Sequence, residues 1–209
     1  FSHDLFPLAL VEVEVEKTGL KYSLLDSVES VDYAIPPLRT LKIHMEIAKK
    51  GKIAHFNDPI EKLLVTQAEK QRIIDSGDEG EKLREFVRTV TEFDADIVVT
   101  NGGDSYLFPY LIRRATINNV LEDFALSRDN VPAVSKICKG RTFFSYGRTF
   151  YRAPTTRLFG RVHIDESNTF ILNESGLEGL FEIARTCRVP LHTASRSSIG
   201  SSMSSLQFY

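Results

Sequence analysis

A short apolar segment in the middle of the chain, DIVVT at Asp96 to Thr100, most constrains the fold. Its nearly continuous apolar character is typical of a strand that is buried on both faces of a sheet. Before it, Glu79 to Glu92 predicts an amphipathic helix, because four apolar residues recur at helical spacing: Leu83, Phe86, Val87 and Val90. After it, the turn at Asn101 to Asp104 opens a second helix over Tyr106 to Arg114. This succession predicts an α/β domain with three layers.

Periodicity and turn residues place the other elements. Further strands are expected at Leu8–Val15, Lys21–Leu25, Leu41–Ile47, Ile60–Gln67 and Arg72–Asp75. Further helices are expected over Asn118–Leu126 and from near Gly176. Two strands, Thr142–Tyr151 and Leu158–Ile164, are expected to pair as a hairpin. Ile35-Pro36-Pro37 interrupts strand pairing and predicts a domain boundary.

Composition narrows the class of protein. Of the 209 residues 42% are hydrophobic and 26% are charged, which is typical of a globular protein. No apolar run approaches the roughly 20 residues of a membrane-spanning helix, so no membrane partner is expected. Cys138 and Cys187 lie in no metal-ligand spacing, which favours reduced thiols in a cytoplasmic protein. The net charge of −2 does not indicate a nucleic-acid binder, but Val134 to Ile164 contains seven Lys and Arg residues and no acidic residue.

Four stretches, in the right order, resemble family-B DNA polymerases. Residues 4–13 (DLFPLALVEV) are similar to the end of the N-terminal domain in an archaeal subgroup with degenerate motifs. Residues 41–47 (LKIHMEI) lie where the family has its first exonuclease motif, and residues 96–111 (DIVVTNGGDSYLFPYL) resemble the second. The fourth, with 144–148 (FSYGR), 160–165 (GRVHID) and 195–200 (SRSSIG), resembles the approach to the polymerase domain.

The resemblance implies an RNase-H-like fold of the DnaQ exonuclease type, with a mixed sheet and flanking helices. Residues 1–37 are then expected to end an N-terminal β domain, residues 38–190 to form the exonuclease-like domain, and residues 191–209 to begin the connection to a polymerase domain. Because the chain starts at Phe1 and not at Met, we expect it to be a piece of a longer polymerase.

Catalysis of phosphodiester hydrolysis by two metal ions requires several carboxylates around Mg²⁺ or Mn²⁺ ions about 3.5–4 Å apart. The family places Asp and Glu two residues apart on its first strand, and here those positions are His44 and Glu46. The aspartate of the second motif falls on Leu107, with Asp104 the nearest carboxylate. No Tyr-x-x-x-Asp motif follows Asn173. The resemblance therefore implies a vestigial exonuclease site, which binds Mg²⁺ or Mn²⁺ weakly or not at all.

Three functions stay open from the sequence. The first is a polymerase fragment whose exonuclease-type domain is inactive or weakly active and supplies scaffold and DNA contacts. The second is an active 3′–5′ exonuclease that binds metal through displaced carboxylates: Glu46, Asp104 and Asp165. The third is a protein-interaction module derived from a polymerase. Structural roles compete with the second, because Asp104 is also a candidate helix cap and Asp165 shares a strand face with His163.

The basic segment is the candidate DNA contact. Arginines interleave with aromatic residues over about 142–164, and arginine binds phosphate while aromatic faces stack on unpaired bases. The expected DNA-binding residues are Arg141, Tyr146, Arg148, Arg152, Arg157 and Arg161. The partners would be single-stranded or primer-template DNA and the remaining polymerase domains of the same chain. Alternatively, the aromatic residues face a core and the arginines pair with carboxylates.

Overall fold

The computed structural model describes residues 5–17, 19–49, 51–132, 137–138, 140–145, 148–152, 154–169 and 171–197. The chain divides into two compact units, Leu38–Asn168 and a second one made of Phe1–Pro37 with Thr169–Tyr209. Each unit is considered by itself. Among the described residues, no helix is both long and apolar enough to cross a membrane.

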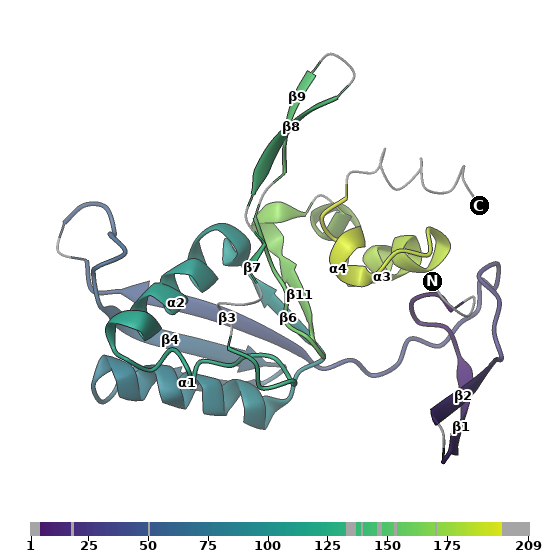
Figure 1. Cartoon of the computed structure of the whole chain (residues 1–209), viewed down its shortest axis with the longest axis horizontal. Coiled ribbons are helices and arrows are strands. Elements are labelled where there is room, and N and C mark those ends of the chain that lie inside the picture. Colours follow the sequence, from purple (N-terminus) through teal and green to yellow (C-terminus); the bar gives the residue numbers. More distant parts are fainter. Residues whose placement is uncertain are drawn as a thin grey trace. The chain divides into compact units, whose positions relative to one another are not determined.

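The first unit is built on a five-stranded mixed sheet (Figure 1). Its strands are β3 (Thr40–Ile47), β4 (Ile60–Gln67), β5 (Lys70–Ile74), β6 (Ile97–Thr100) and β11 (Val162–Asp165). Their order is β11-β6-β3-β4-β5, with β3, β4 and β5 antiparallel and β3, β6 and β11 parallel. This arrangement, with helices packed on it, confirms the predicted α/β class and mixed sheet.

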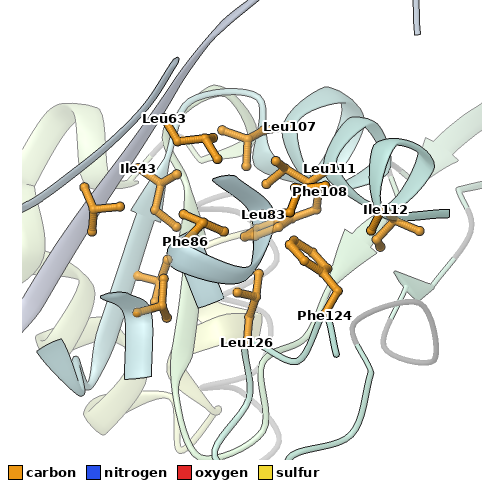
Figure 2. Packing of buried hydrophobic residues seen from close by; sticks show 14 of the residues in the cluster. Ile43, Leu63, Leu83, Phe86, Leu107, Phe108, Leu111, Ile112, Phe124 and Leu126 are labelled. Atoms are coloured by element: carbon orange, nitrogen blue, oxygen red, sulfur yellow. The ribbon is translucent and has the colours of Figure 1, made fainter. Parts of the chain in front are cut away.

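Two helices share a core with the sheet. Helix α1 (Glu79–Phe93) begins at a capping box, in which Asp78 accepts from the Glu81 amide and Glu81 accepts from the Asp78 amide. Its predicted apolar stripe packs on the sheet face that carries Leu41 and Ile43 of β3 (Figure 2). Helix α2 (Phe108–Ile117) contributes four fully buried residues to the same core: Phe108, Tyr110, Leu111 and Ala115.

Strand β6 is buried at all four positions, as its apolar sequence predicts. It is followed by a sharp turn at Gly102, whose φ of 71° lies in the left-handed region that favours glycine. A single π-helical turn, η1 (Gly103–Leu107), then leads directly into α2. Strand, turn and helix therefore follow one another as predicted, with the helix starting two residues later.

Two predicted elements are wrong. Residues 118–126 form turns and not a helix: Asn119 has a left-handed φ of 55°, and Val120, Phe124 and Leu126 enter the core one at a time. The predicted partner of the 142–151 strand also differs. Strand β8 (Arg141–Ser145) pairs with β9 (Arg148–Arg152), so the hairpin ends before residue 158.

The segments that flank this hairpin in sequence form a second, shorter pair of strands. Strand β7 (Ile137–Cys138) pairs antiparallel with β10 (Thr155–Thr156). The segment that was predicted as the second hairpin strand instead forms β11 and pairs in parallel with β6. The pattern of apolar residues is the same for either pairing, so it could not identify the partner strand.

The second unit combines both ends of the described chain. It contains a hairpin of β1 (Val11–Glu16) and β2 (Gly19–Leu24) and two helices, α3 (Ile171–Thr186) and α4 (Leu191–Ala194). Helix α3 is divided by a kink at Gly176, where φ is 66° and ψ is −164°. The helix predicted from near Gly176 corresponds to the part after the kink, and a further helical segment precedes it from Ile171. The unit also places α3 with residues 1–37, whereas the sequence analysis placed it in the 38–190 domain.

Candidate functional site

The first-motif positions lie on an exposed sheet face. His44 and Glu46 alternate with the half-buried Met45 on β3, so both point away from the core that holds Ile43. Across the antiparallel register Glu46 lies opposite Lys62, whose Nζ donates to Glu46 Oε1 at 2.9 Å. This hydrogen bond raises the pKa of Lys62, because it stabilises the charged ammonium. The one family carboxylate that remains is therefore already paired with a cation.

Leu107 lies in the hydrophobic core and not in a polar cleft. It ends η1, is 4% exposed and belongs to the same apolar cluster as Leu63 and Leu111 (Figure 2). The position that the resemblance aligns with the aspartate of the second motif is therefore part of the apolar core. The leucine turns toward the core because burial of its apolar surface is favourable there.

Asp165 is a structural residue of the β6–η1 turn. Its carboxylate accepts the amides of Gly102 and Asp104, both at 2.8 Å, and the Ser167 hydroxyl at 2.8 Å. Asp165 is 1% exposed. Burial of a carboxylate is costly unless hydrogen bonds satisfy it, and these three donors do so. They use lone pairs that a metal ion would need.

Asp104 is equally committed, and it is not a helix cap. Its Oδ1 accepts the Thr156 amide at 2.7 Å and its Oδ2 accepts Asn168 Nδ2 at 3.1 Å. The residue is 1% exposed, and the cap position of η1 is occupied by Gly102. Asp104 therefore ties η1 to strand β10, more than 50 residues away in sequence.

His163 completes this buried polar cluster. Its Nε2 lies 2.8 Å from Thr100 Oγ1, and its Nδ1 lies 3.0 Å from the Thr156 carbonyl oxygen and 3.4 Å from Asp104 Oδ1. Because that carbonyl only accepts, Nδ1 carries a proton in this arrangement. A side chain at Gly103 would not fit, since its Cβ would come within 2.0 Å of Thr100 Oγ1. The cluster accounts for His163 without a metal.

These residues do not fit a two-metal centre. Within the described part of the chain, no three His, Cys, Asp or Glu side chains gather closely enough to hold a metal ion. The described part includes the three displaced carboxylates of the alternative hypothesis: Glu46, Asp104 and Asp165. Two of them hold backbone amides and the third pairs with Lys62.

Arg161 does not face solvent, which corrects its assignment as a DNA contact. Its side chain is 3% exposed. The guanidinium donates to Asp94 Oδ1 at 3.0 Å and to the carbonyls of Ala95 and Leu126 at 2.7 and 3.1 Å. A phosphate could bind it only if these buried contacts were broken.

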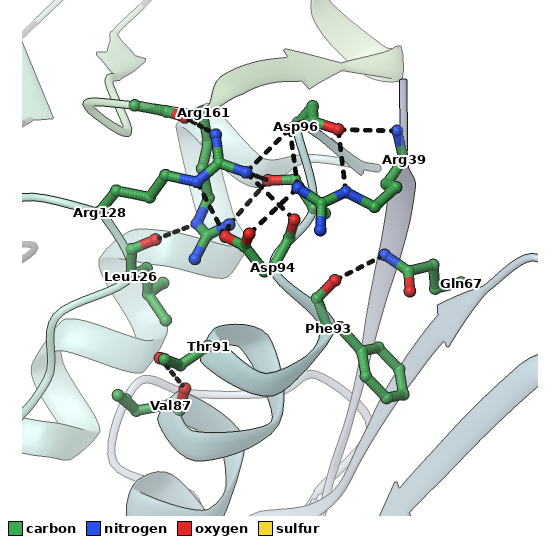
Figure 3. Close-up of polar contacts among 12 residues, drawn as sticks. Arg39, Gln67, Val87, Thr91, Phe93, Asp94, Asp96, Leu126, Arg128 and Arg161 are labelled. Carbon is green, nitrogen blue, oxygen red and sulfur yellow. Dashed lines mark hydrogen bonds and ion pairs between the residues drawn. The ribbon is translucent and has the colours of Figure 1, made fainter. Parts of the chain in front are cut away.

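Arg161 belongs to a network of three arginines and two aspartates (Figure 3). Arg39 and Arg128 each bridge Asp94 and Asp96, at N–O distances between 2.8 and 3.1 Å. The hydrogen bond from Arg128, followed by those from Arg161 and Arg39, lowers the pKa of Asp94 to about 2. Those from Arg39 and Arg128 hold the pKa of Asp96 well below its usual range. The network joins the end of α1 to the start of β6.

The other predicted DNA contacts are placed only in part. Arg157 is exposed. The backbones of Arg141, Arg148 and Arg152 lie in the β8–β9 hairpin, where Arg141 is in register with Arg152. Their side chains, and Tyr146 as a whole, lie outside the described residues, so their DNA contacts stay a prediction.

An aromatic cluster beside β3 was missed by the sequence analysis. Phe56 lies in the loop between β3 and β4 and stacks on Tyr110, with 5.2 Å between the ring centroids. It makes an edge-to-face contact with Tyr106, with 5.9 Å between the ring centroids. Phe56 is 44% exposed and Tyr106 37% exposed. Lys49 and Lys52 of the same loop are also exposed. The signal in the sequence was the KKGKIAHF run directly after the first motif.

The backbone that carries Phe56 is firmly held. The Tyr110 hydroxyl donates to the carbonyls of His55 and Asp58 at 2.8 and 2.6 Å. The Asp58 carboxylate accepts the His55 amide at 2.9 Å, and Arg114 donates to the Asn57 carbonyl at 3.0 Å. An exposed apolar ring on an anchored turn costs little entropy to use in binding.

Comparison with known proteins identifies a family for this chain. The sequence model described as "DNA polymerase family B, exonuclease domain" matches residues 53–172. A DNA polymerase of Archaeoglobus fulgidus is 29% identical over 125 residues, which is 58% of this chain and 16% of that protein. The family B DNA polymerase from Pyrobaculum calidifontis matches 98% of this chain and 34% of its own, with a TM-score of 0.64 and 18% identity. The chain thus spans about a third or less of each relative.

Proposed function

The chain belongs to DNA polymerase family B, and on that premise we propose that it is an exonuclease-type domain that contacts DNA without hydrolysing it. The observation that carries the proposal is the commitment of its carboxylates to other partners. The Asp165 carboxylate holds the β6–η1 turn, the Asp104 carboxylate ties η1 to β10, and Glu46 is paired with Lys62. Two-metal hydrolysis requires carboxylates that are free to share ions, and this supports a domain without that activity.

The wider setting is also a proposal. The longer protein would be a DNA-directed DNA polymerase of the archaeal type, acting in DNA replication in the cytoplasm. This chain would supply scaffold and DNA contacts to polymerase domains elsewhere in that protein. Mg²⁺ or Mn²⁺ would bind weakly or not at all at the β3 face.

The proposed DNA surface combines the aromatic cluster with nearby cations. Phe56 and Tyr106 are exposed and in contact with each other, and Lys49 and Lys52 are exposed residues of the loop that carries Phe56. Aromatic rings stack on bases of any sequence, and lysines attract the phosphates between them. The hairpin arginines Arg141, Arg148 and Arg152 would extend this surface if their side chains reach the DNA backbone.

Replacing Phe56 with alanine is expected to weaken binding of single-stranded DNA about tenfold, because one stacked base is worth about 1–3 kcal/mol. Fluorescence anisotropy with a labelled oligothymidine in EDTA measures the affinity. Ile53→Ala is the matched control, since Ile53 is an exposed apolar residue of the same loop without a ring. Equal affinities of Phe56→Ala and Ile53→Ala would exclude the stacking role.

A protein-interaction module is the second candidate function, and one observation favours it. The β1–β2 hairpin pairs Val13 with Tyr22 and Val15 with Leu20, so one face of it is apolar. These side chains are exposed, with Val15 82% accessible. Measuring the DNA affinity at a series of salt concentrations separates the two functions. A plot of the logarithm of the binding constant against the logarithm of the salt concentration with a slope of about −0.7 per phosphate contact supports DNA binding. No DNA binding at low salt supports the interaction module.

A further inference from the structure

We infer that Lys62 is a built-in counter-ion of Glu46, which takes the electrostatic place of a divalent cation and excludes one from the exposed face of β3. This inference rests on the proposed function, because it explains how an exonuclease-type face can keep a carboxylate without recruiting metal. No residue of the family's motifs corresponds to this lysine, since Lys62 lies on β4 and outside both motif stretches.

The geometry of the sheet fixes this pair. Strands β3 and β4 are antiparallel neighbours, and the register sets Glu46 directly opposite Lys62 and His44 opposite Leu64. Directly opposite residues project to the same face, about 5 Å apart at Cβ. The side chains then need no rearrangement to meet, and Nζ lies 2.9 Å from Oε1. The Lys62 side chain is 31% exposed, so it is partly buried.

The charges on this face support the inference. Glu46 carries −1, Lys62 carries +1, and His44 adds no negative charge where the family has a second carboxylate. Lys42 lies on the same face of β3 as His44 and Glu46, and its Nζ is 3.9 Å from Glu166 Oε1. The hydrogen bond with Glu46, with smaller contributions from Asp75 and Glu61, raises the pKa of Lys62, so the ammonium stays charged at neutral pH.

An ammonium at this position opposes metal binding directly. A divalent ion on Glu46 would lie about 5 Å from the Lys62 nitrogen, and in a water-like dielectric their repulsion weakens binding by about tenfold. Lys42 is four residues from Glu46 along β3, about 13 Å away, where screening at ordinary salt removes most of its effect. The two lysines therefore lie on the same face of the sheet but at different distances from Glu46, and this makes Lys42 the control.

A metal-binding experiment tests the inference against a simple surface ion pair. His44→Asp restores the family's pair of carboxylates on β3, and it is combined with Lys62→Met, with Lys62→Gln or with Lys42→Met. Free Mn²⁺ is measured by electron paramagnetic resonance in the 209-residue chain. We expect both Lys62 combinations to bind Mn²⁺ about tenfold more tightly than His44→Asp alone, and the Lys42 combination to bind like His44→Asp alone.

Two outcomes overturn the inference. One is equal Mn²⁺ affinity with and without Lys62, and the other is no measurable Mn²⁺ binding by either Lys62 combination when both retain the melting temperature of His44→Asp. The unaltered chain is tested in parallel for Mn²⁺-dependent shortening of single-stranded DNA. Shortening by the unaltered chain contradicts the proposed function, whereas only the comparison of Lys62 variants bears on the counter-ion.

Discussion

Replacing Glu79 with alanine is expected to lower the free energy of unfolding by about 3 kcal/mol, the lower end for breaking a buried ion pair. Glu79 begins α1 and pairs with Arg114 of α2, with side chains only 11% and 8% exposed. Its carboxylate also accepts the Ile60 amide at 2.7 Å and Asn118 Nδ2 at 2.8 Å. Although burial alone would raise the pKa of Glu79, these hydrogen bonds outweigh it and lower the pKa. The variant would leave the Arg114 charge and both donors buried without this acceptor.

Differential scanning calorimetry measures the effect. A loss of about 3 kcal/mol in a domain of this size lowers the melting temperature by about 6–12 °C. Glu92→Ala on the same helix is the control, because Glu92 is half exposed and its contacts to Arg72 and Arg88 are 3.6 and 4.0 Å long. Such exposed pairs contribute about 0–1 kcal/mol. A Glu79→Ala melting temperature equal to that of Glu92→Ala would show that the buried pair does not hold α1 to α2.

Replacing Arg185 with alanine is expected to release the N-terminal segment from α3. Arg185 is fully buried and donates to Asp26 Oδ1 at 2.7 Å and to the carbonyls of Ser27 and Leu8 at 2.6 and 3.2 Å. Its guanidinium carbon also lies 4.8 Å from the centre of the Phe6 ring and 4.1 Å from that of Tyr33. Alanine would remove all of these contacts at once, including the hydrogen bond that lowers the pKa of Asp26.

Limited proteolysis measures this release. Because cleavage follows the population of the open segment, we expect the rate within residues 5–37 to rise at least about tenfold in Arg185→Ala. Glu178→Ala, an exposed position on the same helix, should leave the rate unchanged. Unchanged cleavage in Arg185→Ala would mean that residues 5–37 are held mainly by other contacts.

The sequence was informative wherever a local pattern decides the structure. The apolar run at 97–100, the stripe on α1 and the alternation on β3 all predicted their elements, and the motif order predicted the family. The likeness to the Pyrobaculum calidifontis polymerase confirms the RNase-H-like exonuclease fold. Local pattern failed at 118–126, where single apolar residues at near-helical spacing enter the core from turns.

The roles of the acidic residues could not be predicted in this way. The Asp165 carboxylate accepts the Asp104 amide, and the Asp104 carboxylate accepts from Thr156 and Asn168, so the donors lie between 52 and 64 residues away in sequence. Arg161 looked like part of a basic surface, but its partner Asp94 is 67 residues away. The resemblance aligns Leu107 with the aspartate of the second motif, but only the packing of η1 shows that its side chain enters the core. Hydrogen-bond partners at such distances leave no periodic signal.

An assay that follows DNA binding and DNA length in one sample tests whether the domain binds DNA without hydrolysing it. The chain is mixed with 5′-labelled single-stranded DNA in Mn²⁺ or in EDTA, and the Glu46→Ala variant is measured beside it. We expect the DNA to be bound with the same affinity in both conditions and to keep its full length. Shortening of the DNA from its 3′ end in Mn²⁺ by the unaltered chain, abolished by Glu46→Ala, would contradict this expectation.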